Sequence, residues 1–172
     1  MKTYIIIATL FIAILGTASY IAWFYYSESS GWHTEETSGF SVSLPPGWQL
    51  EEKQGIDSAV GEITGDGITL TYDFGWYTAD PRNDSDDENI LSETIDSREA
   101  FIVLPKAEGD VMAVFFPDVE ETISSWRMVN EASAIPIDSF TTTSKFGLRG
   151  QNIPPEKEDI ILRIFRSIQF NS

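Results

Sequence analysis

The sequence predicts an α+β fold, an antiparallel central sheet flanked by helices, placed after one N-terminal transmembrane helix. Three observations lead to this fold class. Residues 4–26 form an uncharged run of 23 residues. Residues 39–117 contain short segments that alternate apolar and polar residues between Gly, Pro and Asp turns, which is typical of half-buried strands. Residues 154–168 begin with two prolines and then place apolar residues at helical spacing.

The first predicted element is a signal anchor or transmembrane helix over residues 1–26. At a rise of about 1.5 Å per residue, a helix of residues 4–26 reaches roughly 35 Å, enough to cross a bilayer. Lys2 precedes it and acidic residues follow it, so the positive-inside rule places the N-terminus in the cytoplasm. We therefore expect a single-pass protein of the cytoplasmic (inner) membrane with a periplasmic or extracellular C-terminal domain. An aromatic membrane-interface belt is expected at Trp23, Phe24, Tyr25 and Tyr26.

A cleaved signal peptide is the alternative interpretation of the same segment. Residues 5–15 would form its apolar region and the small residues 16–19 its cleavage site, leaving a secreted protein. In either case residues 27–38 are small and polar and predict a tether. Residues 39–172 then form the exported sandwich domain.

Composition excludes several classes of function. The chain has 27 acidic against 11 basic residues, for a net charge of −16, with no Cys and one His. Disulfides, thiolate metal sites, cysteine nucleophiles and multi-histidine metal sites are therefore excluded. A pI near 4.2 argues against nucleic-acid binding, which needs clustered Lys and Arg.

The strands and helices of the exported domain follow from turn signals and periodicity. Residues 39–44 predict a strand ended by Pro45-Pro46-Gly47, and Asp66-Gly67 predicts the turn of a first hairpin. Residues 98–117 predict a second hairpin, and residues 139–148 a further strand. Residues 118–129 favour a short helix, with an extended strand as the alternative. The chain is expected to end in an amphipathic helix and a short edge strand.

The acidic loop of residues 78–89 is the candidate for a metal. Asp84, Asp86 and Glu88 alternate as calcium-binding carboxylates do, but Asn89 stands where an EF-hand loop requires Gly. A solvated loop is therefore the favoured interpretation, with calcium as the alternative. No other cofactor is expected.

Catalytic signatures are missing from the sequence. It has no G-x-S-x-G, P-loop or G-x-G-x-x-G motif, and His33, its one histidine, falls in the predicted tether. The candidates for partner binding are Trp76, Tyr77 and Asp80, since exposed aromatic residues carry much of the energy of protein contacts. Their spacing after Phe74 is also compatible with the core of a strand.

Both ends of the predicted domain carry a family resemblance. Phe40, Val42, Pro45 and Trp48 near its start, and S-I-x-F at residues 167–170, resemble the PsbP-like superfamily of small exported α/β sandwich domains. The resemblance implies a central antiparallel sheet covered by helices, and a role as an accessory subunit that binds protein partners. It implies no shared set of catalytic residues.

These observations predict a membrane-anchored extracytoplasmic interaction or accessory module that binds a protein partner without catalysis. One alternative is a carboxylate-based hydrolase or carbohydrate-active domain, which would need two buried acids in a deep pocket. The other is a calcium-responsive binding module.

Overall fold

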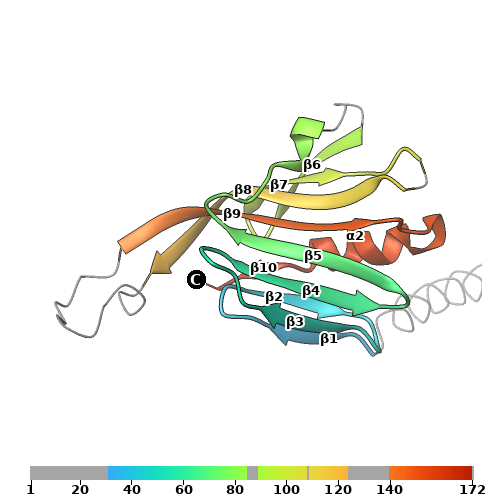
Figure 1. Ribbon diagram of the computed structural model, residues 1–172, viewed down its shortest axis with the longest axis horizontal. Coiled ribbons are helices and arrows are strands. Elements are labelled where there is room, and N and C mark those ends of the chain that lie inside the picture. Colours follow the sequence, from blue (N-terminus) through green and yellow to red (C-terminus); the bar gives the residue numbers. More distant parts are fainter. Residues whose placement is uncertain (1–30, 85–88, 108, 124–139, 172) are drawn as a thin grey trace, which may run out of the picture. The chain divides into compact units, whose positions relative to one another are not determined.

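The computed structural model describes residues 31–84, 89–107, 109–123 and 140–171. The chain divides into two compact units, Met1–Trp32 and His33–Ser172. The second unit consists mostly of β-strands, arranged in two antiparallel sheets (Figure 1).

The larger sheet has seven strands in the order β3-β4-β5-β9-β8-β7-β6. From one edge to the central strand, these are β3 (Gln49–Lys53), β4 (Ala59–Gly65), β5 (Ile68–Gly75) and β9 (Phe140–Gln151). The other half consists of β8 (Val111–Ile123), β7 (Arg98–Val103) and β6 (Ile90–Ile95). In Figure 1, β8 and β9 run on together beyond the neighbouring strands.

The smaller sheet has three strands in the order β1-β2-β10: β1 (His33–Glu36), β2 (Phe40–Leu44) and β10 (Gln169–Phe170). The described residues contain one α-helix, α2 (Glu158–Arg166), and the short 3-10 helices η1 (Pro81–Asp84) and η4 (Pro155–Lys157). Helix α2 buries Ile161, Ile164 and Phe165, and Arg166 in its last turn binds Glu93 of β6. The predicted C-terminal helix is therefore confirmed.

The predicted fold class, a central sheet flanked by helices, is wrong. A second sheet covers the core where a layer of helices was expected. Strand β2 explains this, because its alternation buries Phe40, Val42 and Leu44 completely. Such a strand can only bury that face against another sheet or a helix, and here it faces the seven-stranded sheet.

Aromatic rings join the two sheets. Phe146 of β9 lies 4.8 Å from Phe40 of β2 and 5.4 Å from Phe170 of β10, measured between ring centres. It also contacts Phe74 of β5 and Phe116 of β8 within its own sheet. Edge-to-face arrangements dominate, as expected for packed aromatic rings. The core therefore lies between the sheets, with Phe146 at its centre.

Both hairpin predictions are confirmed. Strands β4 and β5 pair around Asp66 and Gly67, which have φ angles of 52° and 78°. These positive values are those of a type I′ turn, which Asp-Gly sequences favour. Strands β7 and β8 form the second hairpin.

The short helix favoured over residues 118–129 is wrong where the structure describes it, because β8 continues to Ile123. Its pairing with β9 shifts register between Phe116 and Val119, so that Pro117 and Asp118 form an irregularity in the ladder. A bulge accommodates a proline that a regular central strand would exclude. Residues 124–129 lie outside the described residues.

The expected single-pass inner-membrane protein with a signal anchor is not supported. In the part of the chain that the structure describes, every helix is too short or too polar to cross a bilayer. Residues 4–26, with the predicted aromatic belt at Trp23, Phe24, Tyr25 and Tyr26, lie outside the described residues.

Candidate functional site

The predicted aromatic pair lies on a turn directly after β5. Along β5 every second residue is buried, ending with Tyr72 and Phe74. Continued alternation would bury Trp76 as well. Instead Trp76 is 50% exposed and Tyr77 is 81% exposed. Phe74 therefore belongs to the core, while Trp76 and Tyr77, here called the aromatic turn, face solvent.

Two buried residues hold the aromatic turn at its ends. Thr78 is buried, and its hydroxyl lies 3.1 Å from the carbonyl oxygen of Gly75 and 3.2 Å from that of Lys145 on β9. A Cβ at Gly75 would lie only 2.5 Å from the Cβ of Ser58, in the loop between β3 and β4. Glycine therefore lets this loop approach closely. The chain enters and leaves the turn at fixed points, with both aromatic residues outside.

Asp80 fixes the segment that follows the aromatic turn. Its carboxylate accepts hydrogen bonds from Arg82 Nε at 2.9 Å and from Arg82 Nη2 at 2.6 Å. This hydrogen bonding lowers the pKa of Asp80 below its usual value. The Arg82 guanidinium in turn stacks 3.8 Å from the ring centre of Phe101 on β7. Asp80, predicted as a partner-binding residue, thus uses its carboxylate within the domain.

One more large apolar residue lies at this end of the sheet. Ile56 is fully exposed and belongs to the same β3–β4 loop that approaches Gly75. Ile56 and the anchor Thr78 are not among the residues predicted from the sequence. The local signals were weak, since a lone Ile in a Gly- and Asp-containing loop and a Thr after two aromatic residues are both common.

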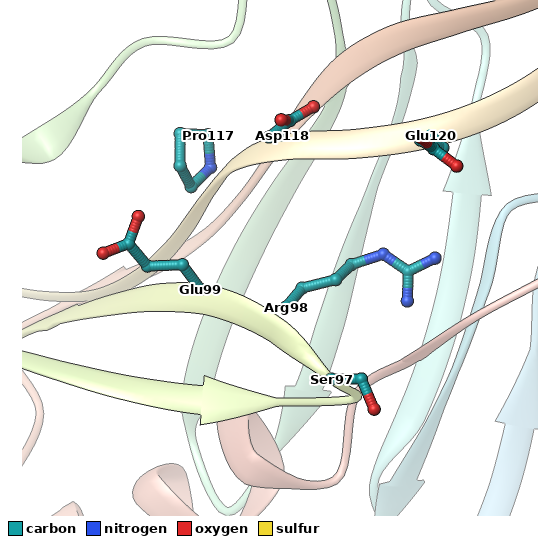
Figure 2. Close-up of a pocket in the computed structure, with 6 residues that line it drawn as sticks. All are labelled: Ser97, Arg98, Glu99, Pro117, Asp118 and Glu120. Atoms are coloured by element: carbon teal, nitrogen blue, oxygen red, sulfur yellow. The ribbon is translucent and has the colours of Figure 1, made fainter.

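A hollow lies at the β6–β7 turn, beside the irregularity of β8 (Figure 2). It has a volume of about 480 Å³ and is lined by Ser97, Arg98, Glu99, Pro117, Asp118 and Glu120. Figure 2 shows the side chains of Arg98 and Glu99 pointing in opposite directions from β7. Arg98 binds the carboxylate of Asp96 at 2.6 Å.

The carboxylates of this hollow are poorly placed for hydrolysis. Glu99, Asp118 and Glu120 are all exposed. Acid–base catalysis by two carboxylates needs environments that separate their pKa values, usually through burial of one of them. These exposed side chains share the same aqueous environment, so the hollow offers no such difference.

The remaining predicted residues fall largely outside the described part of the chain. Asp86 and Glu88 are among the residues not described, and Asp84 ends η1 without a described side chain. Among the residues that the structure describes, no three His, Cys, Asp or Glu side chains are grouped as a metal site would require. His33 begins β1, within the predicted tether, and its Nε2 lies 3.2 Å from Glu35 Oε1.

Comparison with known proteins adds no relative: no family model, curated protein or solved structure matches this chain. The resemblance to the PsbP-like superfamily therefore stays a prediction.

Proposed function

We propose that this domain is a binding module without catalytic activity, and that it contacts a protein partner through the aromatic turn. The observation that carries the proposal is the exposure of Trp76 and Tyr77 between the buried residues Gly75 and Thr78. Tryptophan and tyrosine are enriched among the residues that dominate binding energy at protein interfaces.

The anchored geometry strengthens this proposal. A flexible loop loses conformational entropy when it binds, whereas a turn that is already fixed loses little. Thr78 fixes the backbone after the turn, and the Asp80–Arg82 ion pair fixes the segment beyond it. A partner that covers these two exposed aromatic side chains would remove apolar area from water, which favours binding.

The charge of the chain restricts the partner. With a net charge of −16, the protein repels strongly acidic surfaces and favours neutral or basic ones. We therefore expect a partner with an apolar hollow for the two rings and a neutral or basic rim. Ile56, at the same end of the sheet, extends the apolar contact.

The test is quantitative capture of partners from the native source with the full chain as bait. The variant Trp76→Ala/Tyr77→Ala is compared with wild type and with Leu91→Ala, a matched change at an exposed apolar residue on β6. At least one protein captured by wild type should be depleted tenfold or more by the double variant and retained by Leu91→Ala. Equal melting temperatures would establish that all three baits are folded. An identical set of captured proteins for wild type and the double variant would refute the proposal.

A further inference from the structure

A second candidate site lies on the outer face of the seven-stranded sheet, away from the aromatic core. It is a groove of about 260 Å³ over β5, β9 and β8, and the segment of residues 78–81 forms one wall. Gly147 and Ala113 also line it, and Thr78 packs closely over Gly147, where an added Cβ would lie 3.1 Å from Thr78 Cγ2. This volume is below the range of pockets for drug-sized ligands, so it suits a small molecule.

Asp73 supplies one charge in this groove. Its Oδ1 atom is buried and has no hydrogen-bond partner among the described residues. The register pairs Asp73 with Gly147, so no side chain stands opposite to satisfy the carboxylate. Asp73 lines the groove, and since a buried acceptor without a donor is unfavourable, an N–H group that reached Oδ1 would relieve that cost.

Arg149 supplies the opposite charge. It lies on β9, two residues beyond Gly147, and so is the diagonal neighbour of Asp73 across the strand pair, about 7–8 Å away. Its side chain is exposed and lines the groove. Within the part of the chain that the structure describes, neither Asp73 nor Arg149 belongs to an ion pair.

Lys145, two residues before Gly147 on β9, is the other diagonal neighbour of Asp73 but does not line the groove. Asp80 does line it, but its carboxylate is bound by Arg82. Glu62 on β4 pairs with Lys53. Asp73 and Arg149 are thus the two lining charges that remain open to a ligand.

We propose that the groove binds a small zwitterion of the α-amino acid class, with its ammonium group on Asp73 and its carboxylate on Arg149. A ligand with only a positive charge would be repelled by Arg149, and a ligand with only a negative charge would be repelled by Asp73. A molecule that carries both charges complements both residues. This inference rests on the groove and is independent of the aromatic turn.

The test uses three probes and the ¹H–¹⁵N spectrum of the full chain. Alanine carries both charges, alaninamide lacks the carboxylate, and N-acetylalanine lacks the ammonium. Alanine should shift the amide signals of Gly147 and Ala113 at millimolar concentration, and each of the other probes should bind roughly tenfold more weakly or worse. Absence of a shift with alanine, or equal binding of the three probes, would overturn the proposal.

Two variants and a matched control locate the site. Asp73→Asn and Arg149→Gln should each weaken alanine binding by roughly tenfold or more, since each removes a charge-assisted hydrogen bond. Glu62→Gln changes a carboxylate on the neighbouring strand and should leave alanine binding unchanged. Alanine binding that survives Asp73→Asn would place the ligand elsewhere and refute the assignment. The probe series itself needs no variant, so a misfolded variant leaves the proposal testable.

Discussion

The substitution Tyr72→Phe removes a single buried oxygen from the core. Tyr72 is 3% exposed, and its ring packs edge-to-face against Phe40 at 5.0 Å and stacks on Phe146 at 6.3 Å. Its hydroxyl is buried and has no hydrogen-bond partner among the described residues. Burial, assisted by the negative charge of Glu52, raises the pKa of Tyr72 to about 12. The phenol is therefore neutral at ordinary pH, and its O–H donor is unused.

The expected result is a gain in stability. An unpaired buried polar group costs about 1–3 kcal/mol, and phenylalanine keeps the ring contacts while removing that cost. The small void left by the oxygen cancels part of the gain. We expect the free energy of unfolding to rise by about 1 kcal/mol, which raises the melting temperature by roughly 2–4 °C in a chain of this size.

The assay is urea and thermal unfolding followed by circular dichroism. Tyr77→Phe is the matched control, because Tyr77 is 81% exposed and its substitution should change stability by less than about 0.5 kcal/mol. Tyr72→Phe should also remove the absorbance change of a tyrosine that ionises near pH 12. A loss of about 1 kcal/mol or more in Tyr72→Phe would mean that the hydroxyl makes a stabilising hydrogen bond, and would refute the reasoning.

Three further predictions concern stability. Phe146→Ala should lower the free energy of unfolding by about 3–5 kcal/mol, measured in urea, because this ring joins both sheets; a loss below about 1 kcal/mol would contradict that role. Gly65→Ala should also destabilise, since a Cβ there would lie 2.2 Å from the Trp48 ring, and an unchanged urea midpoint would contradict this contact. Asp80→Asn should change how stability depends on pH. The folded pKa of Asp80 is lowered, so its contribution is present above the unfolded value near 3.9 and is lost as the pH falls through the folded pKa. Wild type should therefore be more stable than Asp80→Asn at pH 7, and the two stabilities should approach each other below about pH 4. A difference in stability that stays constant with pH would contradict a role for the ionised Asp80 carboxylate.

Local turn chemistry explains which elements could be predicted from the sequence. The β4–β5 hairpin follows from Asp66-Gly67, because this dipeptide adopts positive φ angles with little strain. Strand β6 was not predicted, because the turn that joins it to β7 lacks a sequence signal of this kind. Its turn to β7 uses Asp96 and Ser97, with φ angles of 49° and 62°, and serine gives no such signal.

Long-range pairing explains what could not be predicted. The small sheet depends on β2 pairing with β1 on one side and with the two-residue β10 on the other. The contact between β2 and β10 joins Phe40 to Phe170, which are far apart in the sequence. No local pattern encodes such a contact, so alternation in β2 indicated a strand without indicating its partners.

The sequence indicated the residues of the aromatic turn as candidates for binding, but it did not indicate that Trp76 is exposed. The order Tyr72, Phe74, Trp76 has the period of a strand, which favours a core position for Trp76. The tertiary contact of Thr78 with the carbonyl of Lys145 ends that alternation. Since Lys145 lies on β9, the signal that exposes Trp76 is outside the segment itself. The residue types suggested a binding surface, and only the fold decided which rings face solvent.

Thr78 allows one variant to test both proposals. It ends the aromatic turn and also lines the groove, and its buried hydroxyl donates to main-chain carbonyls of β5 and β9. Thr78→Val keeps the shape of the side chain but removes the donor, which should cost about 1–2 kcal/mol of stability. A looser segment should weaken both partner capture and alanine binding, whereas Trp76→Ala/Tyr77→Ala should weaken capture alone. If Thr78→Val lowers stability as expected but leaves both activities intact, rigidity of this segment does not contribute to binding, and the argument from a fixed turn fails.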